Sequence, residues 1–346
     1  MRVLECRAKL TSTVRAKDSI LTTESSQSRN RDNSVSESFR LLIIIVSDTF
    51  CGRSWEYTQH STSAMVCDPL IELPEKELDL FCEEVLKKDW PNSIHVYYFI
   101  KTSLEWRKKK NLKIQLLATN TCMADGTFIG VKYSDNGSSM IVMYSLNDEA
   151  LENAIKTSSK IDWSRRPVLE AILDRHIGVV NRSLAARGIM SKSYSFSGIY
   201  CIDLHQAANI EIPPIEDVKI EPVTDGKDLE YIYSVWAHND IYSFGELLDT
   251  ALLGGSFGVY SKENGLLMSW VMVTHYGGVG VLQSREDCLR KGYASLATRT
   301  LTKAMANCGI TPHACIMDCN TRSRAFFEKL GYKRVAGIQY LTTQPM

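Results

Sequence analysis

The sequence of 346 residues lacks an excess of charge of either sign, because 40 basic residues balance 40 acidic ones. Formal neutrality gives no global attraction to nucleic acid or to an anionic membrane surface. The chain also lacks long hydrophobic runs, and residues 41–46 form a run of six apolar residues where a bilayer span needs roughly 20. We therefore expect neither a nucleic-acid partner nor a membrane partner.

Paired cysteine motifs are also lacking. The ten cysteines contain no CxxC pair, and Cys315 and Cys319 have no matching histidine or cysteine cluster beside them. No secretory signal precedes them, so we expect reduced thiols, no bound metal and an intracellular protein. Several basic residues and many Ser and Thr residues near the N-terminus keep a mitochondrial location open beside a cytoplasmic one.

Large apolar residues are scarce at the beginning of the chain. Residues 11–40 are rich in Ser, Thr, Asn and charge, a composition that favours disorder. Met65 begins a segment with an ordinary domain composition, so residues 1–66 are interpreted as a disordered or non-native leader. The remaining length suits two domains, for which we expect residues 67–212 and 215–346.

A turn between a strand and a helix is the most informative motif that is present. Residues 279–282 form an apolar strand pattern, and residues 295–307 carry a helical stripe. Between them, Gly292 and Ala294 keep the backbone uncrowded, while Arg290 and Lys291 add positive charge. A helix that begins at such a turn offers unpaired N–H groups to an anion, so this segment predicts a site for a pyrophosphate.

A second strand and helix follow downstream. Residues 313–318 favour a strand, Asn320 is placed as an N-cap or turn residue, and residues 323–330 favour a helix that Gly331 ends. Residues 332–335 then start another strand. Upstream, residues 218–223 predict a strand, residues 225–236 a helix, and residues 256–271 a hairpin around Gly265.

This order of elements resembles the GNAT superfamily of acyl-CoA-dependent N-acyltransferases, and within it the glycine N-acyltransferase-like proteins. The resemblance is close over residues 215–340 and looser over residues 67–210. It implies an α/β fold with a mixed sheet in the C-terminal domain, preceded by a divergent GNAT-like α/β domain. It also implies acyl-CoA or acetyl-CoA as the co-substrate. The residues expected to bind it are Val281, Leu282, Arg290, Lys291, Gly292, Tyr293, Ala294, Ser295, Asn320 and Phe326.

Four residues, at three places in the sequence, depart from the family pattern. Leu289 stands where the superfamily turn usually has Gln or Arg, and Phe327 stands where many members carry a Tyr that is thought to protonate the leaving thiolate. Gly277 and Gly278 occupy the place of an acidic residue thought to act as the base in glycine-conjugating members. A phenylalanine cannot donate a proton, so the acid position is vacant.

The general base stays open among the carboxylates and histidines near the expected cleft. Among the candidates, Asp318, at the end of its strand, is best placed to reach the cleft, although a carboxylate ahead of Asn320 is more often a turn-forming residue. The other candidates are Glu286, Asp287, His238 and His275. Cys288 lies close to the turn, but without a His or Asp pattern we expect it to pack rather than to act as a nucleophile.

The first half of the chain also alternates elements. We expect helices over residues 75–88, 147–158 and 167–187, strands over residues 95–100 and 194–203, and a hairpin over residues 128–144. This half has no phosphate-binding turn, so it either shapes the acceptor pocket or has a packing role. Residues 210–215 are the expected junction.

We therefore expect an enzyme that moves an acyl group from a CoA thioester to the amine of a small acceptor, such as glycine or another amino acid. A protein or polyamine N-acetyltransferase is an alternative with the same chemistry. A catalytically weakened acyl-CoA-binding protein is the alternative from a different class. The sequence indicates neither the acyl chain nor the oligomeric state.

Overall fold

The computed structural model describes residues 67–346. The expectations for residues 1–66, including the leader, the apolar run at 41–46 and the start at Met65, lie outside the described residues. The described strands are β1 (Leu70–Glu72), β2 (Ile114–Thr119), β3 (Phe128–Tyr133), β4 (Ser139–Tyr144), β5 (Val168–Leu173), β6 (Ile189–Cys201), β7 (Val218–Glu221), β8 (Ser256–Ser261), β9 (Leu267–Val273), β10 (Val279–Ser284), β11 (His313–Met317) and β12 (Lys333–Pro345).

The α-helices of the described part are α2 (Glu75–Glu84), α3 (Ile94–Lys109), α4 (Cys122–Asp125), α5 (Asp148–Thr157), α6 (Asp174–Ala185), α7 (Leu204–Ala208), α8 (Gly226–Val235), α9 (Phe244–Asp249), α10 (Tyr293–Asn307) and α11 (Thr321–Lys329). Short turns of other helical types are η1 (Leu86–Asp89), η2 (Trp163–Arg165), η3 (Thr250–Gly254) and η4 (Glu286–Cys288). Side-chain N-caps start several of the helices, as with Asn147 before α5, Asp225 before α8 and Asn320 before α11.

The strands form two sheets. An eight-stranded mixed sheet has the order β1-β2-β3-β4-β5-β12-β6-β11, and a four-stranded antiparallel sheet has the order β10-β9-β8-β7. In the larger sheet β4 and β5 are parallel and the other neighbours antiparallel. Helices cover both faces of each sheet. In the larger sheet α2 and α3 pack on one face and α5 and α6 on the other, and in the smaller sheet α10 packs on one face and α8 and α9 on the other.

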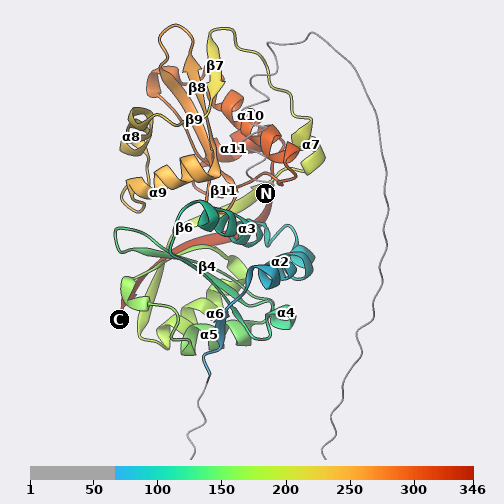
Figure 1. The fold of residues 1–346 in the computed structure, drawn as a ribbon, viewed down its shortest axis with the longest axis vertical. Helices are drawn as coiled ribbons and strands as arrows, with labels where there is room; N and C mark the ends of the chain where they lie inside the picture. The colour runs from blue at the N-terminus through green and yellow to red at the C-terminus, as the bar shows by residue number, and fades with distance from the viewer. Residues whose placement is uncertain (1–66) are drawn as a thin grey trace, which may run out of the picture. The chain divides into compact units, whose positions relative to one another are not determined.

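The two longest strands connect the halves of the chain. β6 and β12 have 13 residues each and pair over most of their length. β12, from the C-terminal end, lies between β5 and β6, while β11 pairs with β6 (Figure 1). The larger sheet therefore contains strands of both halves, because β12 of the second half lies between β5 and β6 of the first, and β11 of the second half pairs with the other edge of β6. The predicted division at 212/215 stays a prediction, but the strand pairing joins residues 333–345 to the first half's sheet.

Two of the predicted elements are wrong. Residues 95–100 belong to helix α3 and not to a strand. Their β-branched and aromatic side chains favour a strand locally, but α3 is buried around most of its circumference, which hides the helical period.

The expected helix over residues 167–187 is in fact strand β5 followed by α6. All of β5 beyond Val168 is buried, because the strand lies between β4 and β12 under helices on both faces. Such a strand shows no alternation of polar and apolar residues, so its apolar run can be mistaken for a helical segment.

Candidate active site

A cavity of about 190 Å³ lies between the two sheets. β10 and β11 are successive strands of the chain, but each stands at the edge of a different sheet. The cavity opens between these edges, where Val279, Gly280 and Val281 of β10 face His313, Cys315 and Met317 of β11. The alternate spacing of the β11 residues shows that one face of that strand forms the wall.

β10 is irregular where it borders the cavity. Its register with β9 shifts between Gly280 and Gln283, which leaves Val281 and Leu282 without partners in β9. Val281 has φ +50°, a conformation that is rare for a β-branched residue. Such a bulge turns backbone groups away from the ladder, so the polar groups of this segment are available to a ligand.

The turn before α10 lies where the sequence predicts it, and its backbone is left-handed at two residues. Arg290 has φ +61° and Gly292, the N-cap of α10, has φ +84°. Gly292 has no side chain to cap the helix, so the first-turn N–H groups of α10 keep no partner from the N-cap residue. Arg290 and Lys291 are exposed at this end of the helix, and Tyr293, Ala294 and Ser295 are half-buried.

The predicted base, Asp318, follows β11 but does not line the cavity. Its side chain is 41% exposed and forms an ion pair with Arg334, Oδ2 to Nη2 3.2 Å. The preceding residue, Met317, lines the cavity. The structure therefore separates Asp318 from the groups that surround the cavity.

The predicted distal residues lie around helix α11. The Asn320 side chain caps this helix by accepting from the Ser323 N–H at 3.0 Å. Phe326 is half-buried, whereas Phe327 is 4% exposed and packs edge-on against Tyr332 with ring centroids 5.0 Å apart. Phe327 is thus a core residue and does not line the cavity.

A buried carboxylate lies behind the cavity wall. Glu170, on β5, is 1% exposed and accepts from the Tyr242 hydroxyl at 2.7 Å through Oε1. Its Oε2 accepts from the Tyr276 hydroxyl and from His275 Nε2, the latter at 3.1 Å. Burial alone would raise the pKa of Glu170, but the hydrogen bond from His275, its positive charge when the ring is protonated, and the hydrogen bonds from the two tyrosines hold the pKa below its ordinary value.

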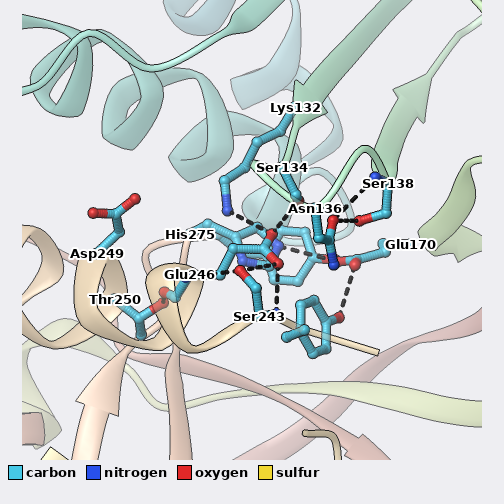
Figure 2. Close-up of polar contacts among 12 residues, drawn as sticks. Lys132, Ser134, Asn136, Ser138, Glu170, Ser243, Glu246, Asp249, Thr250 and His275 are labelled. Atoms are coloured by element: carbon cyan, nitrogen blue, oxygen red, sulfur yellow. Dashed lines mark hydrogen bonds and ion pairs between the residues drawn. The ribbon is translucent and has the colours of Figure 1, made fainter. Parts of the chain in front are cut away.

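A second buried charge cluster contributes Lys132 and Glu246 to the cavity wall (Figure 2). The Lys132 Nζ lies 3.2 Å from Glu246 Oε1, which also accepts from the Ser134 hydroxyl at 2.6 Å. The other oxygen of Glu246 accepts from the Ser243 N–H at 2.9 Å, which completes the capping box of α9. Burial raises the pKa of Glu246, yet the Lys132 charge and these hydrogen bonds outweigh it and lower the pKa.

The cysteines near the site are unsuited to nucleophilic chemistry. Cys315 lines the cavity, but burial raises the pKa of its thiol to about 12. Cys288 is buried beside the turn, where burial and then Asp287 raise its pKa. In the structure seven described cysteines, including these two, form no disulfide, whereas Cys308 is disulfide-bonded, which differs from the expectation of reduced thiols.

Sequence reasoning missed Glu170 and Lys132. Glu170 lies within an apolar run assigned to a helix, and its partner His275 is 105 residues away in the sequence. His275 was among the candidate bases. A lone carboxylate inside a buried strand was the available signal, since an unpaired charge is rarely buried.

Comparison with known proteins supports the predicted fold. Residues 256–340 match the family model of FR47-like proteins. A Drosophila protein of known structure is 18% identical, with a TM-score of 0.70, and the match covers 80% of this chain and 99% of that one. A tandem GNAT protein from the clavulanic acid biosynthesis pathway is 10% identical, with a TM-score of 0.50 over 80% of this chain and 98% of that one. No curated protein matches the sequence.

The fold is therefore a mixed-sheet α/β fold made of two GNAT-like halves, as the sequence predicts. The narrower likeness to glycine N-acyltransferases stays a prediction. Within residues 67–346, no helix is both long and apolar enough to cross a bilayer. The same residues contain no group of three or more His, Cys, Asp or Glu side chains placed to hold a metal ion.

Proposed function

We propose that the protein is an N-acyltransferase that moves an acyl group from a CoA thioester to the amine of a small acceptor. The observation that carries this proposal is the cavity between the diverging edges of β10 and β11, beside a bulged strand that leads into the α10 turn. A GNAT fold with this arrangement supports an acyl-CoA site in the C-terminal half. An acyl-CoA donor also agrees with the expected cytoplasmic or mitochondrial location.

The proposed cofactor site follows the chain from the bulge to the helix. The pantetheine arm extends along Val281 and Leu282, where the bulge frees backbone polar groups. The pyrophosphate binds the N–H groups of Tyr293, Ala294 and Ser295, with Arg290 and Lys291 neutralising its charge. Phe326 and the Asn320 region contact the more distant part of the cofactor.

Most of the rate acceleration in such a site comes from position. Holding amine and thioester together replaces a bimolecular encounter, and effective concentrations of about 10⁵ M or more are known for well-oriented groups. A backbone N–H of the bulge can donate to the oxyanion that forms when the amine attacks the carbonyl carbon. Neither contribution requires a Tyr at position 327.

The acceptor that the cavity suits is an amino acid such as glycine. A cavity of about 190 Å³ holds a small molecule. Among residues 67–346 the buried Lys132 ammonium meets one acceptor, Glu246, so it has donors left for a carboxylate in the cavity. A protein or polyamine acceptor is the alternative, and it would need a route along the open edges of the cavity.

A weakened acyl-CoA-binding protein is the second candidate function. Two observations favour it, because Phe327 is a buried core residue that cannot act as an acid, and Asp318 is held in a surface ion pair. Under this reading the turn binds CoA and no acyl group is transferred.

Thiol release separates these functions. The full chain is incubated with acetyl-CoA or benzoyl-CoA and a panel of amino acids and polyamines, and CoA binding is measured in parallel by calorimetry. Release with glycine or another amino acid supports the proposal, and release only with polyamines or peptides supports the alternative acceptors. Binding without release indicates the weakened binder, and the absence of both contradicts the acyl-CoA site.

A further inference from the structure

Glu170 lies at an irregular point of strand β5, where its carboxylate meets residues of the second half of the chain. β5 carries an irregularity in its pairing with β12 between Leu169 and Ile172, and the intervening Ala171 has φ +52°. Glu170 lies within this bulge, and both of its oxygens accept hydrogen bonds from residues of the second half. Bulges of this kind often redirect a side chain beside an active site. Burying an ionised carboxylate costs free energy, because the group loses its hydration, unless charged or hydrogen-bonding partners compensate for that loss.

His275 connects this carboxylate to the cavity. Its ring lines the cavity and is largely buried, with 13% of the side chain exposed, while its Nε2 faces Glu170 (Figure 2). A carboxylate that accepts from one ring nitrogen fixes the tautomer, so that the other nitrogen, Nδ1, carries the lone pair. The same carboxylate stabilises the imidazolium once that nitrogen is protonated.

The start of β10 cannot supply a base from its own side chain. A Cβ placed on Gly278 would lie 3.0 Å from His313 Nε2 and 3.0 Å from the His313 carbonyl oxygen. A side chain at position 278 would therefore crowd the His313 ring and its carbonyl oxygen. His313 itself is a poor base, because burial lowers its pKa to about 4.

We infer that His275 is the proton acceptor of the reaction and that Glu170, from the other half of the chain, is its positioning residue. This inference rests on the proposed acyl transfer. Gly278 has no side chain, and at this end of the cavity the carboxylate comes from β5 and acts through the imidazole of His275. The two halves thus share one catalytic centre, to which the first contributes Glu170 and the second His275.

The step balances as follows. His275 takes one proton from the acceptor's ammonium group, and the freed nitrogen lone pair attacks the thioester carbonyl carbon. The C–N bond forms while the carbonyl oxygen becomes an oxyanion. As the carbonyl re-forms, the C–S bond breaks, and the second amine proton passes to the leaving thiolate to give CoA. The imidazolium then returns its proton to water.

The test compares two acceptors in three variants of the full chain. His275→Gln removes the base, Glu170→Gln keeps the size of the positioning residue without its charge, and His176→Gln is the control, a buried histidine outside the cavity. Each is assayed with the best amino-acid acceptor and with hydroxylamine, whose nitrogen is uncharged at neutral pH, above the uncatalysed background. Calorimetry with CoA reports whether the cofactor site is intact.

With the amino acid, His275→Gln should lower kcat/KM by about 10²- to 10⁴-fold, the usual contribution of a general base. The loss should shrink to within about tenfold for hydroxylamine, which needs no deprotonation before attack. Glu170→Gln should give a smaller loss with the same dependence on the acceptor, and CoA affinity should stay within twofold in all variants. Equal losses with both acceptors, or no loss in His275→Gln, would overturn the inference.

A measurement without turnover separates this inference from the proposed function. The His275 ring N–H bonded to a carboxylate should give a downfield proton resonance, which is lost in His275→Gln and moves upfield in Glu170→Gln. Without that resonance in the wild-type protein, the pairing and the inference fail. If the wild-type protein releases no CoA with any acceptor, the proposed function is wrong, and the role of His275 as a base is then wrong as well. Normal turnover in His275→Gln defeats the base role alone.

Discussion

Gly292 occupies the position in the α10 turn that side chains tolerate least. Its φ of +84° is unfavourable for an L-residue by roughly 1–2 kcal/mol, although a Cβ there would meet only Ile215 at 3.8 Å. The space is open, so a larger residue changes the turn rather than the core. A substitution at Gly292 should therefore distort the local backbone that presents the N–H groups of α10, and leave the core unchanged.

Gly292→Val should accordingly weaken CoA binding at least tenfold while the protein stays folded. Binding is measured by calorimetry and folding by circular dichroism. Gly265→Val is the matched control, because Gly265 has φ +71° in the exposed β8–β9 hairpin and carries a similar strain far from the turn. Unchanged CoA affinity in Gly292→Val would remove the phosphate site from this turn.

Phe327 offers a test of the vacant acid position. Because its ring is 4% exposed and packs against Tyr332, a new hydroxyl in Phe327→Tyr would be buried without a partner. An unsatisfied buried hydroxyl costs about 1–3 kcal/mol, so the variant should unfold at a lower denaturant concentration without faster turnover. Phe326→Tyr, at the neighbouring half-buried position, should change the stability less. An increase in turnover in Phe327→Tyr would show that the hydroxyl reaches the thiolate after all.

Residue-level prediction from the sequence succeeded where the information was local. The helix start after Gly292, the N-cap at Asn320 and the packing of Cys288 follow from the residue and its neighbours. Glu170 could not be placed this way, because its partners come from loops 72 to 106 residues away. Asp318 stays a prediction as a base, and its ion pair with Arg334 depends on a contact the sequence does not indicate.

At the scale of elements, helix α9 begins with a charge cluster that joins it to strand β3. Glu246 closes the capping box with Ser243 and pairs with Lys132 across the cavity wall. Both side chains are at most 10% exposed. The loss of one partner would leave the other charge buried and unpaired, which costs about 3–5 kcal/mol.

Glu246→Gln should therefore lower the free energy of unfolding by about 3–5 kcal/mol at pH 7, measured by urea titration. Since the pKa of Glu246 is depressed in the folded protein, its stabilisation is present above the unfolded pKa of about 4.5 and is lost as the pH falls through the folded pKa. The difference between wild type and variant should narrow below pH 4.5.

Two further variants check this explanation. Lys132→Met combined with Glu246→Gln should recover part of the loss, because no charge is then left unpaired. Glu221→Gln removes one partner of the exposed pair Lys219–Glu221 and should change the stability by less than about 0.5 kcal/mol. A constant difference between wild type and Glu246→Gln from pH 7 to pH 3 would contradict the charge-based account.

Elements with strong boundary signals were predicted correctly. Local caps or glycine turns mark the ends of these elements, which are the strand–turn–helix unit around α10, the Asn320-capped α11, the β3–β4 and β8–β9 hairpins and the Asn147-capped α5. The errors fall on α3 and β5, two elements buried on nearly all sides. A buried element loses the polar face that reveals its period, so its type is set by tertiary neighbours.

At the scale of the whole molecule, the exchange of β6 and β12 ties the halves together. β12 pairs with β5 along one edge and with β6 along the other, while β6 pairs with β11. Neither strand order nor this exchange is visible in the sequence, because the pairing depends on contacts between opposite ends of the chain. The predicted division at 212/215 can be tested on this basis.

Neither fragment 1–212 nor fragment 215–346 should fold alone, because each lacks a strand from the interior of a sheet. Mixing the two fragments should restore the circular dichroism spectrum and CoA binding. The control is the full chain with a protease site in the segment between α7 and β7, which should stay folded after cleavage. Independent cooperative unfolding of either separate fragment would show that the exchange is dispensable.

The pairing of β6 with β12 also limits how far the cavity can open. Many two-lobed enzymes admit substrate by swinging the lobes apart, and such a hinge needs a connection that bends easily. Here the connection is a pair of 13-residue strands that stay paired, apart from two shifts of register, over most of their length, so moving the two halves apart would break many of their hydrogen bonds. The mouth of the cavity should therefore keep its width during the catalytic cycle. The rate of product release should then depend on the motion of the loop that carries Trp236, His238 and Tyr242, which line the cavity.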